Sequence, residues 1–101
     1  MMENIRIVII DDEAPGRELV KHYLKEVENV EVIAECSDGF GGLKTISTMK
    51  PDLVFLDIQM PRLTGIEMVE VLTEKPEIIF TTAYDQYALR AFELNAVDYL
   101  M

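Results

Sequence analysis

Cysteine, histidine and long apolar runs are scarce in this chain of 101 residues. It has one cysteine, Cys36, one histidine and no tryptophan. A single cysteine excludes an internal disulfide framework and a cysteine-rich zinc site, and it fits a reducing compartment. No apolar run reaches transmembrane length, and the N-terminus does not have the layout of a signal peptide. We therefore expect a cytoplasmic protein that does not bind membranes.

Positive charge is also in short supply. The chain has 9 lysines and arginines against 19 aspartates and glutamates, which gives a net charge of −10. This acidity argues against direct binding of nucleic acid, because a basic face is the usual footprint of such binding. It favours cationic partners, above all a divalent metal. Half of the residues are hydrophobic and 28% are charged, which with this length indicates one globular domain.

Apolar runs alternate with amphipathic stretches along the whole chain. We predict strands at 5–10, 30–34, 53–56, 78–80 and 96–100. The run at 5–10 is β-branched and nearly all apolar, which predicts a strand buried on both faces of a parallel sheet. We also predict a helix between each strand and the next. Pro15 lies in the first turn of the first helix, Thr64 and Glu67 form a capping box on the third helix, and Asp85 caps the fourth helix. This βαβαβαβαβ order predicts an α/β fold with a doubly wound, five-stranded parallel sheet covered by helices on both faces.

Polar residues gather at the carboxyl ends of three predicted strands, where open α/β sheets bind their ligands. Asp11, Asp12 and Glu13 follow the first strand, Asp57 ends the third, and Thr82 ends the fourth. The three ends converge if these strands are neighbours. Helix capping alone would explain one such aspartate, but not the whole set. For Glu13, the rim of a site and the first turn of a helix both remain open.

Three carboxylates in one crevice repel one another unless a cation joins them or some remain protonated. Oxygen ligands without clustered histidine or cysteine favour Mg²⁺, which keeps coordination positions open for water or phosphate oxygens. An aspartate beside such a metal can attack a phosphoryl donor and form an acyl phosphate. A hydroxyl such as that of Thr82 can donate a hydrogen bond to a phosphoryl oxygen.

These residues resemble a known family over the whole chain. The pattern consists of Ile9-Ile10-Asp11-Asp12-Glu13, Leu56-Asp57-Ile58-Gln59-Met60-Pro61, Gly65 and Thr82-Ala83. It is similar to the CheY-like receiver domain of bacterial two-component response regulators. The segments at 82–92 and 97–100 look more narrowly like receivers of the LytTR (LytR/AlgR-type) subfamily. The resemblance implies the flavodoxin-like strand order 2-1-3-4-5.

The resemblance also implies roles for particular residues. Asp57 would accept the phosphoryl group from the phosphohistidine of a sensor histidine kinase. Asp12 and Asp57 would bind Mg²⁺ through their side chains, Gln59 through its backbone carbonyl, and Asp11 through water. Thr82 would bond the phosphoryl group, and Tyr99 would change rotamer when Thr82 moves. Phosphorylation would favour a dimer, and DNA would be bound only by a C-terminal domain that this chain lacks.

Two features of the family pattern are missing. The family lysine after the fifth strand would fall just beyond Met101, and no fifth helix follows. We therefore expect residues 1–101 to be a receiver domain truncated at the end of its fifth strand. The uncovered sheet face would then favour self-association.

Three functions remain open. The first is a phosphorylation-controlled switch that is not a metabolic enzyme and catalyses only its own phosphorylation and dephosphorylation. The second is a Mg²⁺-dependent phosphatase or phosphotransferase, which Gln59 disfavours because it stands where such enzymes place a second, acid–base aspartate. The third is a pseudo-receiver that binds partners without phosphorylation, which the presence of all three aspartates disfavours.

Overall fold

The computed structural model describes residues 4–81 and, for its backbone only, the strand at 98–100. The strands are β1 (Ile5–Ile10), β2 (Val30–Cys36), β3 (Leu53–Asp57), β4 (Glu77–Thr81) and β5 (Asp98–Leu100). The helices of the described part are α1 (Ala14–Leu24), α2 (Gly39–Met49) and α3 (Gly65–Val71). The fourth predicted helix, capped by Asp85, lies outside the described residues.

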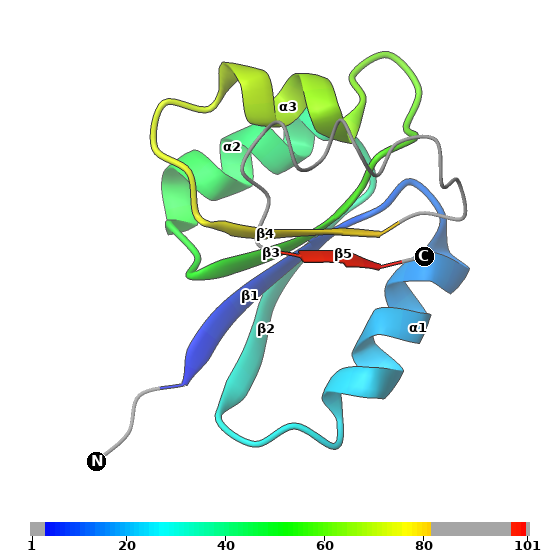
Figure 1. The fold of residues 1–101 in the computed structure, drawn as a ribbon, viewed down its shortest axis with the longest axis vertical. Coiled ribbons are helices and arrows are strands. Elements are labelled where there is room, and N and C mark those ends of the chain that lie inside the picture. The colour runs from blue at the N-terminus through cyan, green and yellow to red at the C-terminus, as the bar shows by residue number, and fades with distance from the viewer. Residues whose placement is uncertain (1–3, 82–97, 101) are drawn as a thin grey trace.

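The strands form one parallel sheet (Figure 1). β1 pairs with β2 on one side and β3 on the other, and β4 pairs with β3. The prediction of a parallel α/β sheet is thus confirmed, with strand order 2-1-3-4. Beyond β4, the backbone of β5 pairs in parallel over three residues. Each crossover returns the chain to the same end of the sheet, so the carboxyl ends of the strands share one edge.

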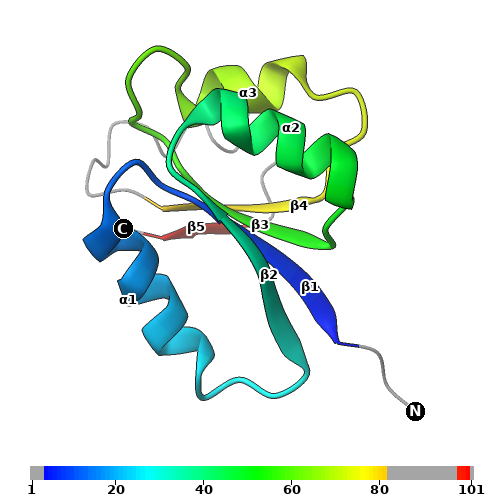
Figure 2. The same cartoon turned by 180° about the vertical axis from the view of Figure 1, so that it is seen from behind.

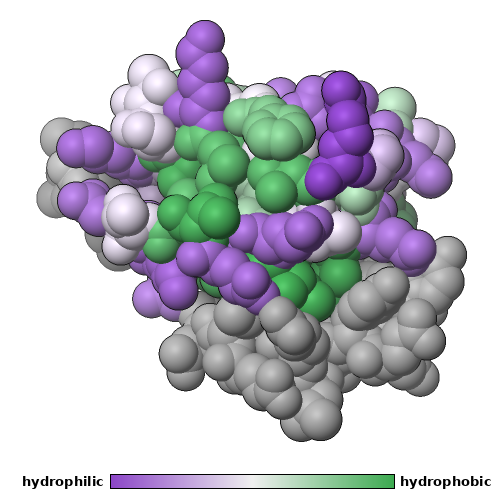
Figure 3. All heavy atoms as spheres, turned by 90° about the horizontal axis from the view of Figure 1, so that it is seen from above, coloured by the Kyte–Doolittle hydropathy of each residue, from purple (hydrophilic) through white to green (hydrophobic). Residues whose placement is uncertain are grey.

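Helices cover both faces of the sheet, as predicted for a doubly wound fold. α2 and α3 lie on one face and α1 lies on the other (Figures 1 and 2). Seen from the side of α2 and α3, hydrophobic residues gather among hydrophilic ones (Figure 3). Phe40 and Val71 are the exposed large hydrophobic residues of these two helices.

The alternation of side chains along each strand divides the core between the two faces. The larger cluster, on the side of α2 and α3, contains Val8, Ile10, Leu56 and Phe80. The smaller one contains Ile7, Ile9 and Phe55, against which Val20 and Leu24 of α1 pack. Ile7 to Ile10 are all at most 1% exposed, which confirms the prediction of a strand buried on both faces.

Local signals in the sequence set the helix starts. Pro15 lies in the first turn of α1, where its missing N–H leaves no hydrogen bond unmade. The Thr64 side chain accepts a hydrogen bond from the Glu67 N–H, and the Glu67 carboxylate accepts one from the Thr64 N–H, so the predicted capping box is present. Among the described helices, none is long and apolar enough to cross a membrane.

The burial of two leucines predicts that the same substitution, leucine to alanine, lowers the free energy of unfolding by different amounts at the two positions. Leu56 is fully buried in β3, whereas Leu19 on α1 is 54% exposed. We expect Leu56→Ala to lower the free energy of unfolding by about 2–5 kcal/mol, because it leaves a cavity behind two packed helices. Leu19→Ala should cost less than about 1 kcal/mol. Urea unfolding of both variants measures the difference, and equal losses would contradict the described core.

Candidate metal and phosphoryl site

The sheet register brings two of the predicted site residues to one edge. Ile10 of β1 lies opposite Leu56 of β3, so the next residues, Asp11 and Asp57, leave their strands side by side. Asp57 in turn pairs with Thr81 of β4. The sequence analysis expected the ends of these strands to converge if the strands are neighbours. The pairing shows that β1, β3 and β4 are neighbours.

The three aspartates form a compact cluster. One carboxylate oxygen from each of Asp11, Asp12 and Asp57 lies within 4.8 Å of the other two. None of the three aspartates is fully buried, so the cluster is open to solvent. Without a cation, these negative charges repel one another strongly at such separations.

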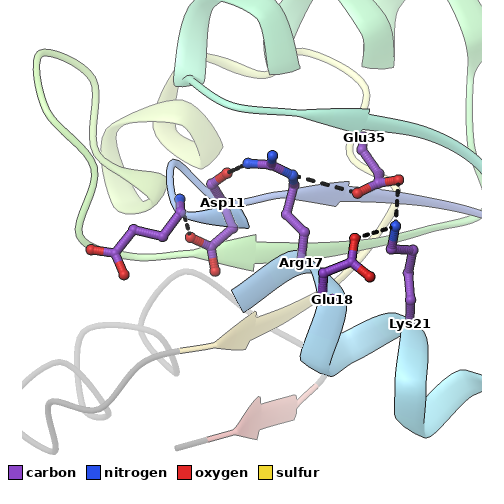
Figure 4. Close-up of polar contacts among 6 residues, drawn as sticks. Asp11, Arg17, Glu18, Lys21 and Glu35 are labelled. Carbon is purple, nitrogen blue, oxygen red and sulfur yellow. Dashed lines mark hydrogen bonds and ion pairs between the residues drawn. The ribbon is translucent and has the colours of Figure 1, made fainter. Parts of the chain in front are cut away.

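Hydrogen bonds hold Asp11 at three points. Its backbone N–H donates to the Cys36 carbonyl of β2 at 3.1 Å, and its Oδ1 accepts from the Glu13 N–H at 2.9 Å. Its carbonyl accepts from Nη1 of Arg17 at 2.7 Å (Figure 4). Glu13 itself is exposed at the N-cap of α1 and makes no side-chain capping bond. The position of Asp11 is thus fixed by β2 and by α1 together.

The loop after β3 holds Asp57. Its Oδ1 accepts a hydrogen bond from the Gln59 N–H at 3.2 Å, and the Ile58 N–H donates to the Thr81 carbonyl at 3.3 Å. The Gly65 N–H donates to the Ile58 carbonyl at 2.8 Å. A Cβ at Gly65 would collide with the backbone carbonyl of Asp57, so only glycine allows α3 to begin this close to the strand end.

The environment of Asp57 favours its protonated form. Burial is the largest cause, followed by the negative charge of Asp11, and together with Asp12 they raise the pKa of Asp57 to about 7. The hydrogen bond from the Gln59 N–H opposes this shift. A bound cation would act in the opposite direction by favouring the ionised carboxylate.

The donor set fits Mg²⁺ better than a softer metal. All three candidate ligands are carboxylates, which are the hard oxygen donors that Mg²⁺ prefers. Because the cluster is open to solvent, it is accessible to water or phosphate oxygens, which Mg²⁺ normally retains as ligands.

Three further predicted site residues are described less completely. Gln59 is exposed directly after Asp57 and Ile58, and its backbone carbonyl stays a predicted ligand. Thr82 lies outside the described residues. Tyr99 belongs to β5 by its backbone, and its side chain lies outside the described residues. Among the described residues, Arg17 makes a charged side-chain contact at this site that the sequence analysis missed, because a side chain bonded to a loop carbonyl leaves no periodic signal.

This site and fold coincide with those of a known family. The model of the response regulator receiver domain matches residues 7–101, and the chain belongs to this family. Members are signalling switches of two-component systems rather than classical enzymes, and they interact with sensor histidine kinases. Receiver domains generally bind Mg²⁺ at an acidic pocket, and the cluster described above provides one.

Individual relatives agree with this assignment. The chain is 48% identical over 99 residues to an uncharacterized response regulatory protein of Yersinia pestis, covering 96% of this chain and 42% of the relative. It is 44% identical over 99 residues to the transcriptional regulatory protein BtsR of Escherichia coli, covering 96% and 41%. The chain thus spans about two fifths of the length of these relatives.

Solved structures show the same fold. The response regulatory domain of protein mrkE from Klebsiella pneumoniae superposes with a TM-score of 0.86 at 31% identity, covering 95% of this chain and 81% of that one. The receiver domain of AraT, a response regulator from Geobacillus stearothermophilus, gives 0.84 at 35% identity, covering 94% and 78%.

The close approach at Gly65 predicts a costly substitution. Gly65→Ala should lower the free energy of unfolding by about 1–3 kcal/mol, because its methyl group must displace the backbone at Asp57. Gly41→Ala in the first turn of α2 is the matched control, since the methyl group there meets only the Asp38 side chain. Urea unfolding compares the two. A Gly65→Ala protein as stable as the Gly41→Ala protein would contradict the described loop.

The raised pKa of Asp57 predicts a pH-dependent gain from removing its charge. The folded protein retains the proton up to about pH 7, whereas the unfolded chain loses it near the ordinary value of 3.8. Wild-type stability therefore falls across this window as pH rises. In EDTA, we expect Asp57→Asn to stabilise the protein by roughly 1–3 kcal/mol at pH 8, after allowing for solvent screening, and by much less at pH 4.5.

Urea unfolding at the two pH values measures this gain. Asp52→Asn, at the other end of the sheet, is the control and should give no comparable difference. An Asp57→Asn gain that is the same at both pH values would show that ionisation of the Asp57 carboxyl group is not its source.

Proposed function

We propose that this chain is the phosphoacceptor receiver of a two-component response regulator, with Asp57 as the residue that is phosphorylated. The observation that carries the proposal is the meeting of Asp11, Asp12 and Asp57 at the carboxyl edge of the sheet, with Asp57 at the end of β3. Such an arrangement provides a nucleophile and a cation site in one crevice.

The reaction transfers a phosphoryl group between two side chains. A carboxylate oxygen of Asp57 attacks the phosphorus of the kinase phosphohistidine, an O–P bond forms and the P–N bond breaks. The imidazole leaves with the bond electrons and takes up a proton from solvent. Asp12 and Asp57 would hold Mg²⁺ through their side chains, Gln59 through its carbonyl, and Asp11 through water. When bound, Mg²⁺ supplies positive charge that offsets the carboxylates and the phosphoryl oxygens.

The response to phosphorylation would pass through Thr82 and Tyr99. The Thr82 hydroxyl would donate a hydrogen bond to the phosphoryl group, and the ring of Tyr99 would follow its movement. The phosphoryl group would thereby stabilise one of two conformations, which is a shift in population.

The output would come from a separate domain. We propose a cytoplasmic transcription regulator in which residues 1–101 form the receiver domain and phosphorylation favours a dimer. A LytTR-type domain would bind the DNA. Two findings support a transcriptional output. The relative BtsR is named a transcriptional regulatory protein, and this chain spans about two fifths of its length.

Phosphorylation by acetyl phosphate tests the proposal directly. With Mg²⁺ present, intact-mass spectrometry should show one added phosphoryl group on the wild-type protein and none after addition of EDTA. Asp57→Asn should abolish the adduct, because an amide is not a competent nucleophile. Asp52→Asn removes the same charge at the far end of the sheet and should leave phosphorylation unchanged.

Other outcomes distinguish the alternatives. An adduct that persists in Asp57→Asn would identify a different nucleophile. An absent adduct in a protein that binds Mg²⁺ would identify a pseudo-receiver, which acts as an interaction module without phosphorylation. Continuous turnover of acetyl phosphate at enzymatic rates would favour a phosphatase.

A further inference from the structure

Arg17 makes a contact at the acidic site although it is not a candidate ligand. Its Nη1 donates to the carbonyl of Asp11 at 2.7 Å, and its Nε faces Oε1 of Glu35 on β2 at 3.4 Å (Figure 4). The side chain is only 20% exposed. One guanidinium group thus joins the loop after β1 to the neighbouring strand.

Glu35 is itself held on its other side. Its Oε2 accepts from the Lys21 ammonium at 3.0 Å, and the same ammonium lies 2.7 Å from Oε1 of Glu18 (Figure 4). Hydrogen bonds to the two carboxylates raise the pKa of Lys21 above its ordinary value. Leading away from Asp11, the side chains of Arg17, Glu35, Lys21 and Glu18 therefore alternate in charge, and their net charge is zero.

The Arg17 contact is one of the three hydrogen bonds that hold Asp11. Asp12 follows in the chain, so the carbonyl that Arg17 holds belongs to the peptide group joining the two aspartates. A change in the orientation of this peptide would move both side chains relative to Asp57. Among the described contacts of that peptide, the Arg17 bond is the one made by a charged side chain.

We propose that Arg17 is a positioning residue of the cation site, which orients the Asp11–Asp12 peptide so that both carboxylates face Asp57. This inference rests on the proposed binding of Mg²⁺. Glu35 keeps the guanidinium in place and compensates its charge. Groups that orient metal ligands in this indirect way typically change metal affinity by about 10–100-fold.

Two possible roles of Arg17, as a positive charge and as a positioning group, predict opposite changes in Mg²⁺ affinity when its guanidinium is removed. If the guanidinium acted only through its positive charge, its removal would make the site more negative and strengthen Mg²⁺ binding. If it acts by orienting the peptide, its removal weakens binding. A lysine retains the charge but has one nitrogen instead of a planar fork, so it does not reproduce both contacts.

Calorimetric titration with Mg²⁺ alone separates these effects. We expect both Arg17→Lys and Arg17→Gln to weaken Mg²⁺ binding by about tenfold. Arg6→Lys is the matched control, because Nη1 of Arg6 also donates to a backbone carbonyl, that of Lys50, at 3.1 Å. That contact lies at the opposite end of β1, and its loss should leave Mg²⁺ affinity unchanged.

The outcomes distinguish this inference from the proposed function. Wild-type protein without Mg²⁺ affinity would overturn both. Wild-type binding that is unchanged by Arg17→Lys, or strengthened by Arg17→Gln, would overturn the positioning role alone. If circular dichroism shows that the Arg17 variants do not fold, Glu35→Gln replaces them at about 0.5 M KCl, where added charge is screened. Weaker binding by Glu35→Gln supports the role of Arg17, and unchanged binding refutes it.

Discussion

Repulsion among three carboxylates is the constraint on which the site depends. Asp11, Asp12 and Asp57 would separate in an unfolded chain, but the register of β1 and β3 forces them together. Burial of Ile10 and Leu56 directly behind them keeps the strand ends from moving apart. This repulsion adds to the effect of burial in raising the pKa of Asp57, and a divalent cation is the chemical means of relieving it. The fold thus stores the unfavourable energy that metal binding releases.

Contacts from α3 and from α1 hold the three aspartates together on two sides. Gly65 lets α3 begin against the backbone of Asp57, and the capping box at Thr64 starts that helix at the required residue. On the other side, the first turns of α1 bring Arg17 to the carbonyl of Asp11. Together, Gly65, the capping box and Arg17 fix the positions of three carboxylates that repel one another.

The sequence predicted the sheet and the cluster because both leave repeating or positional signals. The β-branched run at 5–10 indicated a strand buried on both faces, and the strand-end rule selected Asp11, Asp12 and Asp57. The contact of Arg17 could not be predicted, since it joins a helix to a loop carbonyl and depends on the exact path of the chain. Thr82 and Tyr99 stay predictions, as does the carbonyl of Gln59.

The central claim is that the three aspartates at the ends of β1 and β3 form one divalent cation site. Titration of ¹⁵N-labelled protein with substoichiometric Mn²⁺, followed by amide spectra, tests it most directly because the paramagnetic ion broadens signals near its binding site. The account predicts that the amides at 11–13 and 57–59 broaden first and together, and that Mg²⁺ restores them. Broadening spread over the exposed acidic residues of α1 and α3, with the strand ends unaffected, would contradict it.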